Sequence, residues 1–410
     1  MPDRSLPPSH FPDTRRRTAI AVLALPLWLA ACGGGSKDPD REVTPPVVTP
    51  PVPVEVSGPG ELKSATHINT IAVGDIAAAL KSADSKAPPV APRYAVDSWR
   101  ITYLTTDGQG KSVTASGLVS VPVKPAGVAS PVVSYQHGTI FKDADAPSNN
   151  VVASEPPLIM ASLGAIVLAP DYVGYGASKG TQHPYLLSAP SAAAVTDLLT
   201  AAKTWRQKTS LADNGQLFLV GYSEGGYVTM AAHRALQAGN SPHKAQIVGS
   251  VPGAGPYHVG VTMDALLDRV RNENKVLGAL INPGFLSHLG STVRDEVRRQ
   301  LMKALIPDDA DVGFQSTFID NFLADDTGAI ERDSNVHDWK PEVPVRMFHG
   351  RDDQTVPYAA ATATLQAMQK RGAQDVLLTS CSAIPASHLG CVPPYFAYMV
   401  QQISLVARNL

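Results

Sequence analysis

Residues 217–226 read Leu-Phe-Leu-Val-Gly-Tyr-Ser-Glu-Gly-Gly, and this stretch decides the fold. Its first four residues are apolar and predict a short buried strand, whereas the residues from 224 to 237 predict a helix. A Gly-x-Ser-x-Gly motif centred on Ser223 separates the two elements. A serine hydroxyl is a weak nucleophile, and a sharp turn between strand and helix exposes it beside a base and a helix N-terminus. The motif alone recurs by chance in glycine-rich chains, but in this context it predicts Ser223 as a nucleophile.

The regions on either side of this turn repeat the same alternation of strand and helix. Short apolar runs rich in β-branched residues predict buried strands at 131–135, 165–169, 216–220, 247–251, 345–348 and 376–379. Helical segments are predicted at 191–206, 224–237, 359–370 and 394–408. Such alternation favours a mostly parallel sheet with helices on both faces. Ahead of it, the segments 98–103 and 112–123 predict antiparallel strands that open the body as a meander, with Asp107-Gly108 as a turn. The chain is therefore expected to adopt the α/β-hydrolase fold.

One long interval, from 256 to 343, contains no comparable strand. Amphipathic patterns predict helices there at 263–277, 293–305 and 314–323. We interpret this interval as a helical lid inserted into a core made of residues 61–255 and 344–410, because such caps often control access and exclude water. A simple packing appendage is the alternative interpretation.

The partners of Ser223 are predicted from their order along the chain. In this fold an acid and then a histidine follow the serine. After Asp353 the sequence contains one histidine, His388, which is the expected base. The predicted strand 345–348 leads into a Gly-x-x-Asp-x-x-Val-Pro pattern, which favours Asp353 over its neighbour Asp352 as the acid that orients the imidazole.

Two backbone amides are predicted to bind the developing oxyanion of an ester or amide carbonyl. One is the N–H of Glu224, directly after the nucleophile. The other lies in the loop after an earlier strand, where His137-Gly138-Thr139 favours the N–H of Thr139 over its neighbours. No cofactor is required for this chemistry, and no Cys-x-x-Cys or His-Glu-x-x-His pattern suggests a metal site.

The first sixty residues carry targeting signals. Three arginines at 15–17 precede an apolar run from 18 to 31, which is typical of a signal peptide and too short for a confident membrane span. The run ends in Leu-Ala-Ala-Cys, which is similar to the lipobox of bacterial lipoproteins and predicts residues 1–31 as the signal and Cys32 as the lipidated residue. An ordinary signal peptide with Cys32 as a bystander is the alternative. Residues 32–60 form a Pro-rich tether. We thus expect an exported enzyme that is lipid-anchored at the outer membrane or cell surface, or secreted.

The remaining cysteines and the charge balance add two expectations. Cys381 and Cys391 flank His388, and in an oxidising compartment they are expected to form a disulfide. It would restrain the histidine loop or serve the fold alone. The 34 basic and 36 acidic residues give a formal charge of -2 without a basic cluster beyond the first residues. No nucleic-acid partner is therefore expected, and the membrane is a partner only through the lipid anchor.

These residues resemble the secretory lipase (lipase A-like) branch of the α/β hydrolases. The matching features are the elbow around Ser223, the inserted cap, the Asp353 and His388 pair, and the segments 135–139, 170–176 and 183–186. The resemblance covers 89–410 and implies hydrolysis of carboxylic esters. Those lipases commonly have glycine after the nucleophile. Glu224 departs from that pattern, and its carboxylate is expected to disfavour anionic or long-chain substrates.

The predicted activity is a serine carboxylic-ester hydrolase that acts through an acyl-enzyme on small or lipid-like acyl esters, with polyesters among the candidates. Two other classes stay open. A serine peptidase of the aminopeptidase type could use the same fold and triad. An anchored binding protein with a decayed site would retain the fold without the activity.

Overall fold

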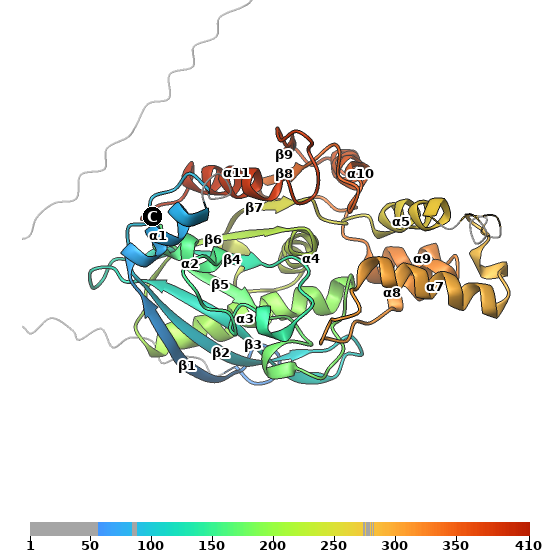
Figure 1. The fold of residues 1–410 in the computed structure, drawn as a ribbon. Coiled ribbons are helices and arrows are strands. Elements are labelled where there is room, and N and C mark those ends of the chain that lie inside the picture. Colours follow the sequence, from blue (N-terminus) through green and yellow to red (C-terminus); the bar gives the residue numbers. More distant parts are fainter. Residues whose placement is uncertain (1–55, 84–87, 274, 276–278, 280, 282) are drawn as a thin grey trace, which may run out of the picture. The chain divides into compact units, whose positions relative to one another are not determined.

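The computed structural model describes residues 56–83, 88–273, 275, 279, 281 and 283–410. The predicted signal peptide, Cys32 and the predicted tether up to residue 55 lie outside these residues. Within the described part of the chain, the strands form one nine-stranded sheet in the order β1-β2-β3-β5-β4-β6-β7-β8-β9 (Figure 1). This mixed sheet, with helices on both faces, confirms the predicted fold class.

The sheet changes from antiparallel to parallel along its width. The antiparallel part joins β1 (Leu62–Ile71), β2 (Val96–Thr106), β3 (Ser112–Pro122) and β5 (Ile166–Pro170). The parallel part continues from β5 through β4 (Ser130–Gln136), β6 (Asp213–Tyr222), β7 (Ile247–Gly253), β8 (Val345–His349) and β9 (Val376–Ser380). Parallel strands end at the same edge of a sheet. The loops after β4, β6 and β8 therefore lie at one edge.

Two hydrophobic cores lie on the two faces of the sheet. On β6, Leu217 and Leu219 belong to one core and Phe218 and Val220 to the other, as the period of two in a strand requires. One core packs α3 (Ser188–Lys208), α4 (Glu224–Ala238) and α10 (Tyr358–Lys370). The other packs α1 (Val73–Ala83), α2 (Pro156–Ser162) and α11 (Val392–Ser404).

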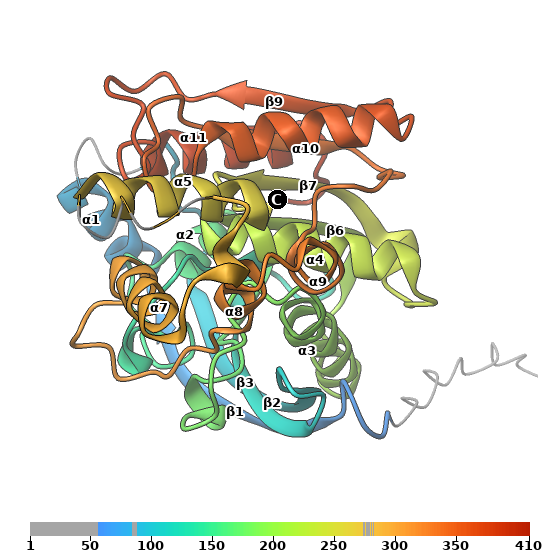
Figure 2. The ribbon, with the colours of Figure 1, turned by 90° about the vertical axis from the view of Figure 1, so that its right-hand side faces the viewer.

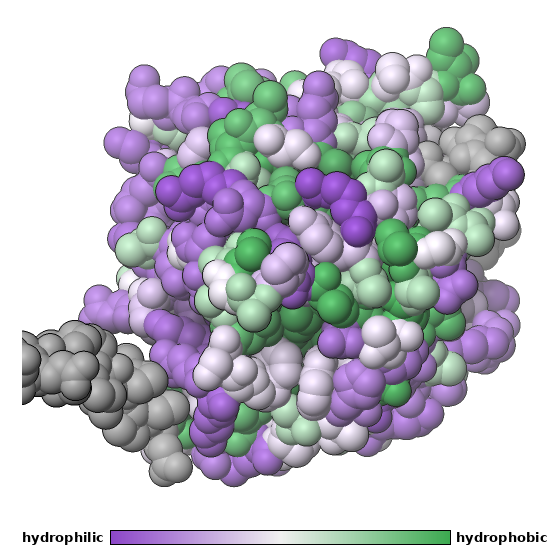
Figure 3. Space-filling view, turned by 90° about the vertical axis from the view of Figure 1, so that its left-hand side faces the viewer, coloured by the Kyte–Doolittle hydropathy of each residue, from purple (hydrophilic) through white to green (hydrophobic). Residues whose placement is uncertain are grey.

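A helical segment is inserted between β7 and β8. Its main helices are α5 (Val259–Glu273), α7 (Ser291–Leu305) and α8 (Thr317–Leu323), followed by the short α9 (Thr327–Ala329). These helices project beyond the sheet in Figure 1 and lie in front of it in the turned view of Figure 2. The opposite side of the molecule is seen in Figure 3, where hydrophobic residues gather among hydrophilic ones.

Each predicted strand and helix overlaps an observed element, and the differences have local causes. The body does not open with the predicted meander, because β1 and α1 precede it. β1 lies at the sheet edge with most of its residues exposed or half-buried, so it lacks the apolar pattern that marks a buried strand. The helix α2 was also not predicted, because it spans seven residues and begins with two prolines. The first turn of a helix tolerates proline, which lacks an N–H group, because backbone N–H groups at that position have no partner within the helix.

Candidate active site

The turn after β6 holds Ser223 in a strained conformation. Its backbone has φ 59° and ψ −126°, which is uncommon for a residue with a side chain. Two glycines let the surrounding backbone approach this turn closely. A Cβ atom would lie 2.6 Å from the Gln136 carbonyl oxygen at Gly221, and 2.0 Å from the same oxygen at Gly225. The sequence Gly-x-Ser-x-Gly is therefore a steric requirement of this turn.

Three side chains that are far apart in the sequence meet at this turn. The Nε2 atom of His388 lies 2.8 Å from Oγ of Ser223. The Nδ1 atom of the same ring lies 2.6 Å from Oδ2 of Asp353. His388 and Asp353 are 8% and 4% exposed, so this chain of hydrogen bonds is largely shielded from water. The geometry permits proton transfer from the hydroxyl to the imidazole.

Asp353 is surrounded by donors that favour its ionised form. Its Oδ1 accepts from the N–H groups of Thr355 and Val356 at 2.8 and 2.9 Å, and Oδ2 also lies 3.3 Å from Nε2 of His349. Burial raises the pKa of this carboxyl, but the hydrogen bonds from His349 and His388 outweigh it and hold the pKa well below its usual range. A carboxylate at this position accepts the Nδ1 proton of His388, which leaves Nε2 free to accept from the hydroxyl.

Asp352, the alternative acid, has a different set of contacts. Its Oδ2 accepts a hydrogen bond from the Ala386 N–H at 2.9 Å, and its own N–H donates to the Ala386 carbonyl at 3.1 Å. Gly350 allows this close approach, because a Cβ there would lie 2.1 Å from the same carbonyl oxygen. Asp352 therefore joins the loop after β8 to the loop that carries His388.

The histidine loop is held from two further sides. Cys381 and Cys391 form a disulfide, with a sequence separation of 10, as predicted. The Tyr222 hydroxyl donates to the carbonyl oxygen of His388 at 2.8 Å. Next to the serine turn, the Tyr395 hydroxyl accepts a hydrogen bond from the Gly221 N–H at 2.9 Å and donates one to the Val251 carbonyl at 2.7 Å. These bonds connect the serine turn, the histidine loop and α11.

The loop after β4 lies against the serine turn. A Cβ on Gly138 would be 3.3 Å from the Tyr222 carbonyl oxygen and 3.6 Å from Cβ of Ser223. Gly138, Thr139, Ser223 and Glu224 line one cavity. The hydroxyl of Thr139 is 3.2 Å from that of Tyr185. The two predicted oxyanion donors, Glu224 and Thr139, are therefore brought to the same cavity as the serine.

The side chain of Glu224 is buried and paired. It is 2% exposed, and its Oε1 lies 2.7 Å from Nε2 of His183, which is also 2% exposed. The other ring nitrogen, Nδ1, lies 2.9 Å from the Val173 carbonyl, which can only accept. Nδ1 must therefore carry a proton. A second proton lies between Nε2 of His183 and Oε1 of Glu224, since a hydrogen bond there needs one. With the carboxylate engaged in this way, the expected repulsion of anionic or long-chain substrates by Glu224 loses its basis.

Sequence reasoning did not predict the role of His183, which helps to hold this site together. His183 connects Glu224 to the inserted segment, because its N–H donates to the Gly313 carbonyl at 2.7 Å and its carbonyl accepts from the Gln315 N–H at 2.9 Å. In the sequence, the segment 183–186 is marked only by its resemblance to the secretory lipases. Asp171 is fully buried and accepts hydrogen bonds from the hydroxyls of Ser116 and Ser148 at 2.5 Å. It serves loop packing.

The cavity above Ser223 has a volume of about 390 Å³. Helices α5, α7 and α8 of the inserted segment supply part of its wall, including Leu266, Leu305 and Phe318. Helix α11 supplies Val392 and Phe396 on another side. Among the residues that the structure describes, no group of three or more His, Cys, Asp or Glu side chains is arranged to hold a metal ion.

Comparison with protein families identifies the chain. The model of the secretory lipase family matches residues 150–389, more than half of the sequence. The chain belongs to the secretory lipase family. As a secretory lipase it is a carboxylic ester hydrolase, and the predicted family and enzyme class are confirmed. No curated protein matches this secretory lipase significantly by sequence.

Solved structures with the same fold include two bacterial proteins and one fungal lipase. A protein from Legionella pneumophila named as a hydrolase shares 23% identity and a TM-score of 0.65, covering 84% of this chain and 97% of its own. The rice cell wall degrading esterase LipA from Xanthomonas oryzae shares 23% identity and a TM-score of 0.63, covering 86% and 100%. Candida antarctica lipase A shares 18% identity and a TM-score of 0.55, covering 86% and 84%. At these identities the likeness shows the fold.

Proposed function

We propose that this enzyme hydrolyses carboxylic esters through a catalytic triad of Ser223, His388 and Asp353. The observation that carries the proposal is the continuous line of hydrogen bonds from Ser223 Oγ through His388 to Asp353, with both contacts at 2.8 Å or less. In an ester hydrolase this arrangement supplies a nucleophile, a general base and a carboxylate that orients the base.

The reaction divides into acylation and deacylation. Ser223 Oγ attacks the ester carbonyl carbon while its proton passes to Nε2 of His388. The resulting imidazolium returns that proton to the leaving alkoxide when the carbon–oxygen bond breaks, which gives an alcohol and an acyl-serine. Water then attacks the acyl group with His388 again as base, and the acid leaves. Asp353 stays ionised and stabilises the imidazolium.

The N–H groups of Glu224 and Thr139 are the proposed oxyanion donors. A donor aimed at the developing charge contributes about 3 kcal/mol to transition-state stabilisation. Support comes from the proximity of Gly138 to Ser223, and from the position of Glu224 at the first turn of α4, where the helix dipole favours negative charge. The Glu224–His183 pair fixes the side chain of the first donor residue.

The proposed substrates are acyl esters with a hydrocarbon portion, and the range includes polyesters outside the cell. The walls of the cavity favour such substrates, because α5, α7, α8 and α11 contribute apolar side chains to it. We further propose that residues 256–343 act as a lid over this cavity, with 61–255 and 344–410 as the catalytic core. The cap residues lining the cavity support that role.

Membership of a secretory family supports export. Attachment of the exported enzyme through lipidated Cys32 is part of this proposal. None of the helices in the described residues has the length and apolar character needed to cross a bilayer. Replacing Cys32 by alanine and separating membrane from soluble fractions tests the anchor: loss of the enzyme from the membrane supports it, and unchanged fractionation rejects it.

Activity assays separate the ester hydrolase from the peptidase. The enzyme is expected to hydrolyse p-nitrophenyl butyrate and to leave aminoacyl and prolyl p-nitroanilides intact. Ser223→Ala should abolish the ester activity and keep the far-UV circular dichroism spectrum. Peptidase activity without ester hydrolysis would reject the proposal. Failure of the native protein to react with a fluorophosphonate would favour a binding protein instead.

A further inference from the structure

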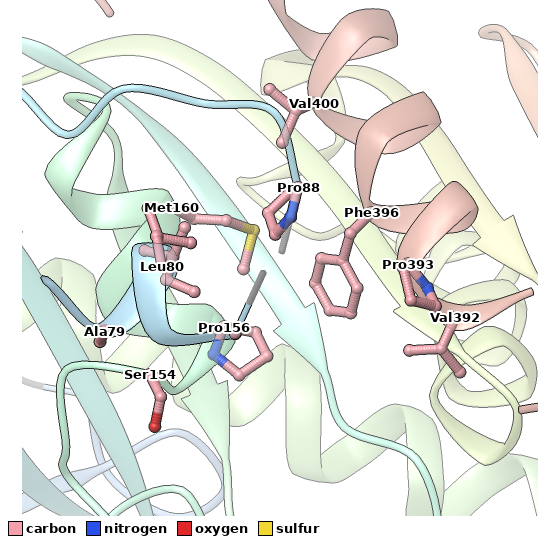
Figure 4. Close-up of a pocket in the computed structure, with 12 residues that line it drawn as sticks. Ala79, Leu80, Pro88, Ser154, Pro156, Met160, Val392, Pro393, Phe396 and Val400 are labelled. Atoms are coloured by element: carbon pink, nitrogen blue, oxygen red, sulfur yellow. The ribbon is translucent and has the colours of Figure 1, made fainter. Parts of the chain in front are cut away.

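A second cavity, with a volume of about 170 Å³, lies between helices α1, α2 and α11 (Figure 4). Ser154 is the one residue with a polar side chain among the described residues that line it. Figure 4 shows Phe396 and Val400 on α11, across the cavity from Leu80 and Met160. Such a lining offers no partner for a charged group, so it is suited to a hydrocarbon ligand.

The second cavity shares a wall with the cavity above Ser223. Val392 and Phe396 line both. The ring of Phe396 is half-buried and packs beside Tyr135, with ring centroids 6.2 Å apart, and Tyr135 also lines the catalytic cavity. The side chain of Phe396 therefore separates the second cavity from the catalytic cavity.

An apolar stripe on α11 leads from the catalytic histidine to the second cavity. It consists of Leu389, Val392, Phe396 and Val400, whose spacing of three and four residues puts them on one side of the helix and its entry turn. Leu389 directly follows His388, lines the catalytic cavity and is 79% exposed. From Val392 to Val400 the rise of a helix gives about 12 Å. The side of α11 that faces the sheet is occupied by different residues, namely Tyr395, Met399 and Ile403.

From this arrangement we propose that the second cavity is the distal part of the acyl-binding site. The carbonyl of the ester lies at Ser223, and its acyl chain runs along the α11 stripe, past Phe396, into the space between α1, α2 and α11. This inference rests on the proposed function, because it takes Ser223 as the point of attachment. Short acyl chains end in the catalytic cavity, and only long ones reach the second.

The test is a chain-length profile of a variant in which the second cavity is filled. Ala79 lines the second cavity and does not line the catalytic one, so Ala79→Trp occupies the proposed distal site. The matched control is Ala78→Trp, at the preceding and exposed position of α1, which lines neither cavity. The measured quantity is kcat/KM for p-nitrophenyl butyrate, octanoate and laurate, each kept monomeric in solution.

Each buried methylene group strengthens binding about fourfold, so exclusion of a few of them is readily measured. Ala79→Trp should lower kcat/KM for laurate by about tenfold or more and change that for butyrate by less than about twofold. Ala78→Trp should leave the whole profile unchanged. Equal laurate-to-butyrate ratios in the native enzyme and Ala79→Trp would overturn the subsite. If the native enzyme hydrolysed none of these esters, the proposed function itself would fail.

Two further measurements test the proposal, and the first of them does not depend on the folding of Ala79→Trp. Phe396→Ala removes the shared ring and should raise the laurate-to-butyrate ratio; an unchanged or lower ratio would contradict the path past Phe396. Dodecyl acetate carries its long chain on the alcohol side. Ala79→Trp should spare its hydrolysis relative to laurate, and a selective loss on dodecyl acetate would assign the cavity to the alcohol and overturn the acyl assignment.

Discussion

His388 Nε2 lies 2.8 Å from Ser223 Oγ, although 165 residues separate them in the sequence. The contact exists because strands β6 and β9 end at the same edge of the sheet. The turn with Ser223 follows β6, and the loop with His388 follows β9. Tyr222 strengthens the contact from the neighbouring position by bonding the carbonyl of His388. Ser223 and His388, the proposed nucleophile and base, are therefore expected to act as a unit.

Removing either member of that unit should therefore cost nearly the same activity. We expect Ser223→Ala and His388→Ala each to lower kcat by about 10⁴-fold or more, and the double variant to be hardly worse than either. Kinetics with p-nitrophenyl butyrate measure this. Losses that multiplied in the double variant would show that the two residues act independently.

Substitution of the neighbouring residues Asp353 and Asp352 should have different effects on the enzyme. Asp353→Asn is expected to lower kcat by about 10⁴-fold, because an amide cannot hold His388 in the required tautomer as a carboxylate does. Asp352→Asn should keep most of kcat and lower the melting temperature slightly, since it weakens one partly buried hydrogen bond from the Ala386 N–H. Comparable loss of kcat in both variants, or the larger loss in Asp352→Asn, would reject the assignment of the acid.

The buried Glu224–His183 pair gives a prediction about the oxyanion site. In Glu224→Gln the amide can donate to Nε2 of His183, so kcat is expected to stay within about tenfold of the native value. Glu224→Ala leaves that buried nitrogen unpaired, at a cost of about 1–3 kcal/mol. We expect kcat to fall clearly further in this variant, with little change in KM. The measurement is kcat and KM for both variants. Equal kcat values in Glu224→Gln and Glu224→Ala would argue against a positioning role for the Glu224 side chain.

Opening the Cys381–Cys391 disulfide should loosen the loop that carries His388. By the chain-entropy estimate, a loop of this length contributes about 2.7 kcal/mol to stability. The double variant Cys381→Ala/Cys391→Ala is expected to melt at a lower temperature and to lose kcat before it unfolds. Thermal scans together with kcat at 25 °C separate the two effects. Full activity at a lowered melting temperature would leave the disulfide with a structural role alone.

Stability should decrease in mild acid because of a buried histidine outside the active site. Burial lowers the pKa of His233 to about 3, whereas an unfolded histidine titrates at about 6.5. Between these values the unfolded chain binds the extra proton, so this contribution to stability is present above about pH 6.5 and is lost as the pH falls.

The slope expected from this one group rises toward about 1.4 kcal/mol per pH unit as the pH falls well below 6.5. His233→Gln should therefore flatten the dependence of the unfolding free energy on pH, measured by urea denaturation between pH 7 and 5. The control is His67→Gln, at a side chain that is 43% exposed. An unchanged slope in His233→Gln would contradict this interpretation.

The sequence predicted those features that have a strong local pattern. Apolar strands that end in loops with glycine, aspartate or histidine indicated the sheet, and the Gly-x-Ser-x-Gly motif predicted the turn between β6 and α4 where Ser223 lies. The contacts of Glu224 were not predictable, because its partner His183 lies 41 residues earlier and nothing in its local pattern marks it as buried. The edge strand β1 was missed for a related reason: its position, and not its own composition, makes it part of the sheet. The predicted lipid anchor at Cys32 stays a prediction.

The most direct test of the account is to locate the covalent adduct formed by a fluorophosphonate. The native enzyme should lose its ester hydrolase activity in step with the attachment of one label, and peptide mass spectrometry should find that label on Ser223. Ser223→Ala should neither react nor hydrolyse p-nitrophenyl butyrate. A label on another residue, or ester hydrolysis that persists in Ser223→Ala, would contradict the account.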